Sequence, residues 1–418
     1  MAGFLFGWNG LPCGDMKRVL IFSLTYHPYI GGAEVAIKEI TDRIDPGEYS
    51  FDMVTLRFDS KLPEVEKFGN VTVHRIGCTV PGVKVSDRNM PFKIRMAKIL
   101  FPVTAFWKAM QLHRTERFDM TWAMMANQSS FAALLFKMVH PRVPYYLELQ
   151  DGNSLVQLKK RQPILRVLWP IYMQVYRRAN IVKAISHCIE KLAREAGYAG
   201  PLVVIPNGVD VKKFSAPIAE DALVEAKEKY GKHMGDVFLF TASRLVLSRG
   251  VEDVIRALAH LPGNVKFLIA GDGEDRAKLE AIANDVGVRE RVVFAGQVNH
   301  VELPLLLRIS DVFVRPSIIE GMGNAFIEAF AAGVPVVATP VGGIPDFLFD
   351  PEANPDMEPT GLFCKVRDPQ SIALAVSRYM RDAALTARVV KNAQELAARR
   401  YEWDLIARDM QERIFKRV

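Results

Sequence analysis

EGMGNAFIEAFAAG, residues 320–333, carries two acidic residues, Glu320 and Glu328, on either side of an expected helix start. Two glycines follow the first acid, and they let the backbone turn closely around a ligand. A helix that begins near Asn324 would direct its free amides and the positive end of its dipole at an anion. The first acid then lies in the loop and the second about one turn inside the helix, so both can approach one ligand from different sides.

Two arginines in TASRLVLSRG, residues 241–250, suggest which groups hold a phosphate. Arg244 follows an expected strand, and Arg249 precedes a glycine and a new helix. Arginine binds phosphate with two parallel hydrogen bonds and keeps its charge, whereas a carboxylate is better suited to accept from sugar hydroxyls. Amides and arginines are therefore expected to bind phosphates, and the two acids the hydroxyls of a sugar and a ribose. Two surface arginines in a turn are the alternative for this segment.

The first half of the chain has a counterpart in SLTYHPYIGGAEVAIKEI, residues 23–40. An expected strand ends there, Gly31 and Gly32 turn the chain, and a helix begins near residue 33. A second helix N-terminus would then face the same ligand. A tight strand-to-helix turn without a ligand is the alternative.

Short β-branched runs alternate with helical patterns along the whole chain, which predicts two α/β domains with parallel sheets. In such folds the ligand lies beyond the carboxyl ends of the strands. The expected strands are 19–23, 51–56, 71–76, 120–124, 145–149, 181–185, 202–205, 237–243, 266–270, 292–295, 312–316 and 334–338.

Four segments are expected along the chain. Residues 1–15 form a disordered extension, residues 16–200 a first Rossmann-like domain, residues 201–398 a second one, and residues 399–418 an amphipathic helix that packs back on the first.

The composition is that of a globular chain, with 50% hydrophobic and 24% charged residues among 418. Its four cysteines and eight histidines are scattered, so we expect reduced thiols in the cytoplasm and no metal site. No apolar run is long enough to cross a membrane. Residues 1–200 contain 27 Lys and Arg against 17 Asp and Glu, which is a net charge of +10 within a total of +7. That basic half suggests an anionic neighbour or a merely solvated surface.

Two basic, aromatic-rich segments, 88–114 and 159–178, favour peripheral contact with an anionic membrane at the inner face of the plasma membrane. Ordinary helices packed on the sheet are the alternative. Prolines at 91, 102, 163 and 170 are expected to interrupt any long helix. No recognised nucleic-acid motif accompanies the basic charge, so no nucleic-acid partner is expected.

Taken together, GGAE (31–34), PNGVD (206–210), SRLVLSRG (243–250), AGDGE (270–274), EGMGNAFIEAFAAG and PVVATPVGGIPD (335–346) resemble family 4 retaining glycosyltransferases of the GT-B fold. The order and spacing of these segments fit from residue 16 to the C-terminus. The resemblance implies a retaining, metal-independent hexosyltransferase that needs no cofactor beyond its UDP-sugar or GDP-sugar substrate. It implies a glycan or lipid-linked acceptor, as in cell-surface polysaccharide or glycolipid synthesis.

The resemblance also implies roles for individual residues. Glu320, Arg244 and Arg249 would be the catalytic set, with Glu320 on donor-sugar hydroxyls and the arginines on the diphosphate. Arg249 stands where the family usually has lysine. The donor-binding positions are Gly31, Gly32, Arg244, Arg249, Gly321, Met322, Gly323, Asn324, Ala325 and Glu328.

One position departs from the family pattern. Gln150, followed by Asp151, stands where a histidine is usual. Glutamine cannot act as a general acid or base but can hydrogen-bond a sugar hydroxyl, so both residues are candidates for holding the acceptor. An epimerase or phosphorylase of the same fold, and a non-catalytic sugar-nucleotide-binding subunit, remain as alternatives. The sugar, the nucleotide base, the acceptor and the oligomeric state carry no sequence signal.

Overall fold

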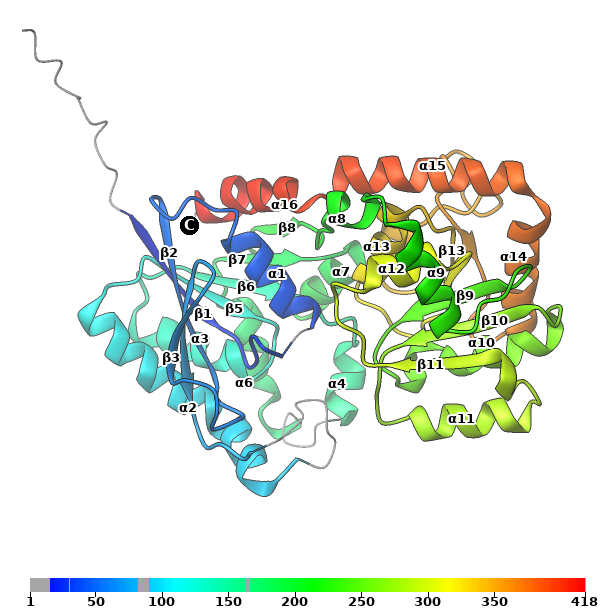
Figure 1. Ribbon diagram of the computed structural model, residues 1–418. Helices are drawn as coiled ribbons and strands as arrows, with labels where there is room; N and C mark the ends of the chain where they lie inside the picture. Colours follow the sequence, from blue (N-terminus) through cyan, green and yellow to red (C-terminus); the bar gives the residue numbers. More distant parts are fainter. Residues whose placement is uncertain (1–15, 30, 82–89, 162–165, 418) are drawn as a thin grey trace, which may run out of the picture.

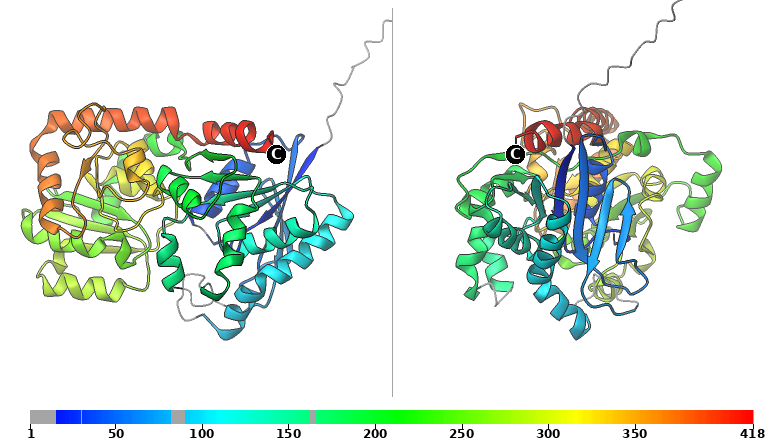
Figure 2. Two further views of the ribbon diagram at one scale, coloured as in Figure 1. Left: turned by 180° about the vertical axis from the view of Figure 1, so that it is seen from behind. Right: turned by 90° about the vertical axis from the view of Figure 1, so that its left-hand side faces the viewer.

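The computed structural model describes residues 16–29, 31–81, 90–161 and 166–417. The extension expected at residues 1–15 lies outside the described residues, as does Pro163. Figure 1 shows two α/β units next to each other, and the last helices run along one edge from the second unit to the first. The view from behind in Figure 2 (left) shows the same arrangement.

The first unit is built, within the described residues, on a sheet with the order β3-β4-β2-β1-β5-β6-β7-β8. Neighbouring strands are parallel, except that β3 runs antiparallel to β4. Parallel strands are covered on both faces, which explains their unbroken apolar runs. The strands are β1 (Lys17–Phe22), β2 (Tyr49–Leu56), β3 (Val65–Phe68), β4 (Val71–Ile76), β5 (Met120–Met124), β6 (Tyr145–Leu149), β7 (Ile181–Ala184) and β8 (Leu202–Val204).

Two details of this sheet differ from the sequence expectations. Strand β3 was not expected, because its four residues lie at the sheet edge and alternate between exposed and half-buried side chains. The strand expected at 202–205 closes the first sheet as β8, so this sheet extends past residue 200.

Helices cover both faces of the first sheet. The face that carries Trp122 and Tyr146 packs against α1 (Gly32–Thr41) and α16 (Trp403–Met410). The opposite face, with Tyr145 and Leu147, packs against helices that come earlier than the C-terminal segment. These are α2 (Phe92–Thr115), α3 (Gln128–Val139), α6 (Trp169–Arg177) and α7 (His187–Glu195). In the chain, α4 (Leu155–Arg161) lies between β6 and α6.

Helix α2 corrects the expectation that prolines break the basic segments. It runs for 24 residues with Pro102 inside it, and Pro91 is its N-cap. Proline removes one backbone donor, but 24 residues packed against α3 and β2 retain the remaining helical bonds. Pro170 lies in the first turn of α6, where its missing N–H has no helical partner to lose. No helix in the described part of the chain has the length and apolarity to cross a bilayer.

The second unit has, in the part of the chain described, a parallel sheet with the order β11-β10-β9-β12-β13-β14. The strands are β9 (Val237–Ala242), β10 (Val265–Ala270), β11 (Val292–Gly296), β12 (Val312–Arg315), β13 (Val336–Ala338) and β14 (Leu362–Phe363). The helices are α8 (Val211–Ser215), α9 (Glu220–Lys229), α10 (Val251–Ala257), α11 (Arg276–Asp285), α12 (Leu303–Arg308), α13 (Asn324–Ala332), α14 (Pro369–Arg381) and α15 (Ala383–Arg400). Short 3-10 turns occur at Leu247–Arg249, Leu258–His260, Arg289–Arg291 and Ile344–Asp346.

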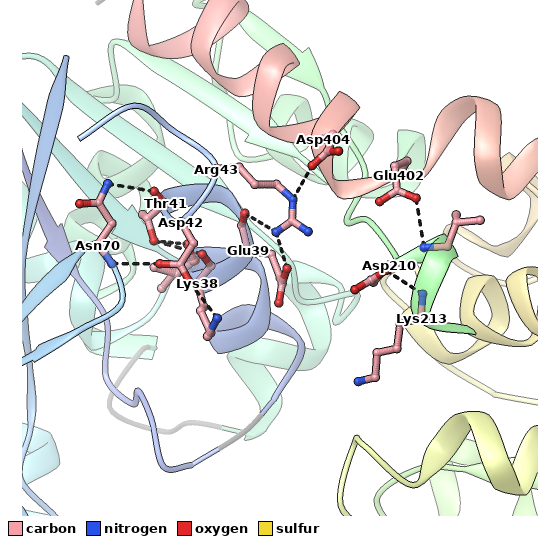
Figure 3. A network of polar contacts seen from close by, with 12 residues as sticks. Lys38, Glu39, Thr41, Asp42, Arg43, Asn70, Asp210, Lys213, Glu402 and Asp404 are labelled. Carbon is pink, nitrogen blue, oxygen red and sulfur yellow. Dashed lines mark hydrogen bonds and ion pairs between the residues drawn. The ribbon is translucent and has the colours of Figure 1, made fainter. Parts of the chain in front are cut away.

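The C-terminal helix returns to the first unit, as expected. Trp403, Ile406 and Met410 of α16, and Phe415 of the π-helical turn Gln411–Phe415, are buried against the first sheet. Figure 3 shows Arg43, just after the end of α1, between Asp404 and Glu39, with Nε 2.8 Å from the Asp404 carboxylate. The fold is therefore the two-domain GT-B arrangement, with the last helix attached to the first domain.

Figure 3 also shows how the crossing segment is tied to the start of the second unit. Glu402 accepts a hydrogen bond from the Val211 backbone N–H at 3.1 Å, and Asp210 caps α8 by accepting from Lys213 N at 2.9 Å. A Cβ added to Gly208 would lie 2.6 Å from the Trp403 indole. The two chain crossings between the units therefore pack directly on each other.

Candidate functional site

Glu320 accepts three hydrogen bonds on a single carboxylate oxygen. Arg249 Nη1 donates to Oε2 at 2.8 Å, Arg315 Nη2 at 2.9 Å and Ser317 Oγ at 3.2 Å. The residue is 6% exposed. Among the residues that the structure describes, no hydrogen bond reaches Oε1, so that oxygen can accept from a ligand hydroxyl.

Arg315 was not expected as a site residue. It ends β12 and is 5% exposed, with Nη1 3.2 Å from the Ala242 carbonyl oxygen at the end of β9. Its guanidinium lies 4.2 Å from the centre of the Phe326 ring, within cation–π range. Burial lowers the pKa of Arg315, and the charge of Glu320 opposes that shift. Arginine still keeps its proton, so Arg315 holds Glu320 from behind.

Helix α13 begins at Asn324, as the sequence predicts, and Gly323 is its N-cap. Gly323 has φ of 87°, a left-handed conformation that side chains other than glycine's rarely adopt. A Cβ added to Gly323 would meet the guanidinium of Arg315, the residue that bonds Glu320. Met322 is buried, and Ala325 lies in the first turn.

Glu328 lies one turn into α13 and faces a different partner. Its Oε1 is 2.9 Å from His300 Nε2, and His300 Nδ1 is 3.0 Å from Lys213 Nζ. Because lysine only donates, Nδ1 accepts and Nε2 carries the proton that it donates to Glu328. His300 thus fixes the direction of the Glu328 carboxylate.

The two arginines expected on the diphosphate have different surroundings. Arg249 is half-buried and bonds both Glu320 and the Ile319 carbonyl oxygen at 3.1 Å. Arg244 is exposed. Burial raises the pKa of Glu34 in the first domain, while the Thr25 hydroxyl, nearby backbone amides and the charge of Arg244 oppose that shift. Arg244 therefore lies within electrostatic reach of the first domain's loop.

The glycines of the first domain meet the start of α13. Gly31 is the N-cap of α1, and a Cβ added to it would lie 2.6 Å from a Glu34 carboxylate oxygen. A Cβ added to Gly32 would lie 3.6 Å from Asn324 Nδ2. The loop at residues 31–32 and the helix start at 324 therefore face each other across the domains.

Gln150 and Asp151 are neighbours in the chain, but their side chains have different surroundings. Gln150 Nε2 donates to Glu148 Oε1 at 2.8 Å and lies 3.4 Å from Asn207 Oδ1, while Gln150 Oε1 accepts from Asn207 Nδ2 at 3.2 Å. Asp151 is exposed and accepts from Asn153 Nδ2 at 2.6 Å. Gln150 thus belongs to a protein network, whereas Asp151 borders the site.

Backbone contacts close the space between the two domains at this point. A Cβ added to Gly152 would lie 2.6 Å from the Glu320 carbonyl oxygen, and one added to Gly321 would lie 2.6 Å from the Gln150 carbonyl oxygen. His187 N donates to Asp346 Oδ2 at 2.8 Å. The absence of side chains at Gly152 and Gly321 lets the strand end of β6 touch the Glu320 loop.

Sequence reasoning missed four contributors: Arg315, His300, Glu148 and Lys183. A signal existed for three of them, because each is a charged residue inside a short apolar strand: VFVR, YYLEL and IVKA. His300 lies in the loop after β11 and had no such signal. In the described part of the chain, no group of three or more His, Cys, Asp or Glu side chains is placed to hold a metal ion.

Comparisons with known proteins agree with this geometry. The family model "Glycosyl transferases group 1" matches residues 224–396, and "Glycosyl transferase 4-like domain" matches residues 31–208. A glycosyltransferase of Methanocaldococcus jannaschii is 25% identical over 94% of this chain and 96% of its own length.

Two further relatives are more similar over a shorter stretch. The GDP-mannose-dependent alpha-(1-6)-phosphatidylinositol monomannoside mannosyltransferase of Mycobacterium tuberculosis is 30% identical over 57% of this chain and 63% of its own length. The D-inositol 3-phosphate glycosyltransferase of Xylanimonas cellulosilytica is 32% identical over 50% of this chain and 49% of its own length. This chain thus spans about half to under two thirds of these two proteins.

Solved structures share the fold over almost the whole chain. Sucrose-phosphate synthase from Thermosynechococcus elongatus superposes with a TM-score of 0.78 at 19% identity, covering 96% of this chain and 98% of that one. Anabaena HepE in complex with UDP-glucose gives 0.74 at 20% identity, covering 96% and 99%. Two matched family models in the expected order, on a GT-B fold, place the chain in the glycosyl transferases group 1 family, and the protein is a glycosyltransferase.

Proposed function

We propose that this glycosyltransferase moves a glucosyl or mannosyl unit from a UDP-sugar or GDP-sugar to a glycan or lipid-linked acceptor, with retention and without a metal ion. The observation that carries the proposal is the meeting of the 31–32 loop, the Glu320 cluster and the start of α13 at one place between the domains. Nucleotide sugars are the partners expected at such a place, since it offers amides, arginines and oriented carboxylates together.

Each donor group has a matching protein group in this proposal. The diphosphate lies at the first turn of α13 with Arg244 and with the guanidinium N–H groups of Arg249 that do not bond Glu320. The free Oε1 of Glu320 accepts from a hydroxyl of the donor sugar. Glu328, held by His300, accepts from the ribose. The two carboxylates therefore bind opposite ends of the donor.

The reaction step needs no protein base. The acceptor oxygen attacks the anomeric carbon on the face from which the diphosphate leaves, the bond between that carbon and the phosphate oxygen breaks, and the acceptor proton passes to the departing phosphate oxygen. Arg244, Arg249 and the helix amides stabilise the charge that develops on the diphosphate. The domains hold the acceptor oxygen beside the departing diphosphate on the same face of the anomeric carbon, which lowers the entropic part of the barrier.

The names of the relatives support the sugar proposed here. One is described as GDP-mannose-dependent, and a solved neighbour was crystallised with UDP-glucose. Both are hexosyl donors with a ribose and a diphosphate. The choice between the two bases is left to the experiment below.

A membrane-facing acceptor is supported by helix α2. Its exposed surface carries large apolar side chains, each 49–68% exposed, at Phe92, Ile99, Leu100, Val103 and Trp107. Lys93, Arg95 and Lys108 lie on the same helix. Apolar side chains flanked by lysine and arginine bind anionic lipid surfaces, so α2 is proposed to face such a membrane. Sedimentation with vesicles of anionic lipid, but not of neutral lipid, is the expected result, and Trp107→Ser should reduce it.

Nucleotide binding and product stereochemistry test the proposal. Thermal stability is measured with UDP, GDP and their glucose and mannose conjugates, because a ligand at ~100 times its dissociation constant adds ~2.7 kcal/mol to the folded state. The anomeric configuration of the product is read by NMR, with EDTA present in parallel reactions. Glu328→Gln is compared with Glu395→Gln, a substitution of an exposed residue on α15.

Stabilisation by one nucleoside diphosphate and its sugars, lost in Glu328→Gln and kept in Glu395→Gln, is the expected outcome. Turnover in the presence of EDTA, with retention at the anomeric carbon, would support the metal-independent retaining mechanism. Inversion at the anomeric carbon would refute the proposed mechanism. Turnover that requires free phosphate, or conversion of the donor without an acceptor, would show a phosphorylase or an epimerase instead.

A further inference from the structure

A buried ion pair lies under the proposed site and takes no part in the chemistry above. Glu148 of β6 and Lys183 of β7 are neighbours in the sheet, and both are 0% exposed. Lys183 Nζ donates to Glu148 Oε1 at 2.6 Å. Moving two charges out of water is costly, and such a pair adds little stability compared with apolar side chains of similar size. The role of the Glu148–Lys183 pair is therefore inferred from the side chains that it holds in place.

The carboxylate of Glu148 has two further hydrogen bonds. Tyr146 Oη donates to Oε2 at 2.7 Å, and Gln150 Nε2 donates to Oε1 at 2.8 Å. Tyr146, Glu148 and Gln150 alternate along the strand and its end, so they share one face. Oε1 of Glu148 also accepts from Lys183, so Gln150 must turn its NH2 group toward that oxygen.

This constraint passes through two more amides. With its NH2 group toward Glu148, Gln150 presents Oε1 to Asn207, which must answer with Nδ2 at 3.2 Å. Asn207 is 1% exposed, and its Nδ2 also donates to Asn324 Oδ1 at 3.3 Å. Asn324 then has its own Nδ2 on the other side, toward Gly32, where an added Cβ would lie 3.6 Å away.

We propose that Lys183 and Glu148 are positioning residues that set the direction of three side-chain amides in series, those of Gln150, Asn207 and Asn324. In this amide relay, Asn324 presents its N–H groups to an oxygen of the nucleotide sugar. The inference rests on the proposed function, because it places the donor between the 31–32 loop and the start of α13. Lys183 donates to Glu148 Oε1 and holds the carboxylate in place, and Gln150 and Asn207 transmit the direction from the first domain to the second. Without this constraint each of the three amides can turn by 180°, and Asn324 would then present its oxygen to the diphosphate.

The inference also gives a reason for glutamine at position 150. The network needs a side chain that donates to Glu148 and to Asn207 and accepts from Asn207 at the same time. The amide of Gln150 meets all three requirements. Gln150 is therefore assigned to this network and not to the acceptor contact expected from the sequence.

Two double variants distinguish an effect on the amide relay (Gln150, Asn207 and Asn324) from an effect on the stability of the core. Glu148→Leu with Lys183→Met removes both charges and the Glu148 oxygen to which Gln150 donates, while the contact of Gln150 with Asn207 is left in place. Glu148→Gln with Lys183→Met removes both charges and keeps a carbonyl oxygen for Gln150. Removing both members of a buried pair avoids an uncompensated charge, so both variants should fold. Gln150→Met breaks the relay at a half-buried strand end and serves if the core variants do not fold.

We expect the Leu/Met variant and Gln150→Met to lower kcat/KM for the donor by about tenfold or more, the value of one hydrogen bond to a charged group. KM for the acceptor should stay unchanged, and the Gln/Met variant should retain most of the donor kcat/KM. Donor kcat/KM equal to that of the unmodified protein in both Leu/Met and Gln150→Met would overturn the inference. A change in acceptor KM alone would also overturn it, and would return Gln150 to the acceptor site.

A second measurement needs no nucleotide. In 15N spectra, the side-chain NH2 signals of Gln150 and Asn207, assigned by their loss in Gln150→Met and in Asn207→Ala, should move in the Leu/Met variant and less in the Gln/Met variant. Signals that do not move would refute the relay whatever the activity. Signals that move in a protein that binds no nucleotide would support the relay and refute the proposed function, so the two failures are distinguishable.

Discussion

Arg315→Met would leave Glu320 as a buried carboxylate with one of its two guanidinium partners. Arg315 Nη2 lies 2.9 Å from Glu320 Oε2, and both residues are at most 6% exposed. Removing one partner of a buried pair usually costs ~3–5 kcal/mol. Arg249 and Ser317 still bond the carboxylate, so we expect about 3 kcal/mol, at the lower end of that range.

The loss should appear as a lower melting temperature of the second domain. For a domain of this size, 1 kcal/mol corresponds to ~2–4 °C, so Arg315→Met should lower it by about 6–12 °C. Differential scanning calorimetry measures this directly. Methionine fills most of the arginine volume next to Phe326, so a cavity contributes little.

Two companion variants identify the cause of the loss. Arg315→Lys keeps the charge but loses the planar guanidinium and its contact with Phe326. Its melting temperature should lie between those of the unmodified protein and the methionine variant. Adding Glu320→Gln to Arg315→Met removes the unpaired charge and should recover part of the stability, although donor turnover is lost. A melting temperature within ~2 °C of the unmodified protein in Arg315→Met would refute the reasoning, since a buried carboxylate would then not need Arg315.

Three further predictions concern other parts of the chain. His300→Ala should weaken nucleotide binding about tenfold for a ribonucleotide and hardly for its 2′,3′-dideoxy analogue, because His300 orients Glu328 toward the ribose; equal weakening in calorimetry with both ligands would contradict this. Burial raises the pKa of Asp253 to about 6. Between pH ~4 and ~6 the folded protein therefore keeps a proton on Asp253 that the unfolded chain has released. The free energy of unfolding falls as the pH rises through that window. Asp253→Asn should therefore raise the unfolding free energy by about 1–2 kcal/mol at pH 8 and leave it unchanged near pH 4, and a gain of the same size at both values would exclude this titration. Gly208→Ala places a methyl group 2.6 Å from the Trp403 ring and should cost about 1–3 kcal/mol, visible as earlier proteolytic release of α16; unchanged proteolysis would mean that Trp403 moves freely.

Much of the fold followed from local pattern. Strand positions such as 120–124 and 145–149 agree with β5 and β6, because a parallel strand buried on both faces is a short apolar run. The start of α13 at Asn324 agreed too, since glycines before an apolar helical pattern mark a helix beginning. The same local logic was wrong at Pro102, which lies inside α2, because packing along 24 residues outweighs one missing backbone hydrogen bond.

The sequence by itself determined the two-domain α/β architecture and suggested the residue types of the proposed donor site. The backbone freedom of glycine, the positive charge of arginine and the hydrogen-bond acceptance of the two acids at 320 and 328 are properties of the residue types themselves. Only the tertiary structure decided which groups hold those residues, because Arg315, His300 and the Glu148–Lys183 pair act through contacts between strands and loops far apart in the chain. It also decided which partners Gln150 has, because Glu148 and Asn207 lie on separate segments that only the folded chain brings together.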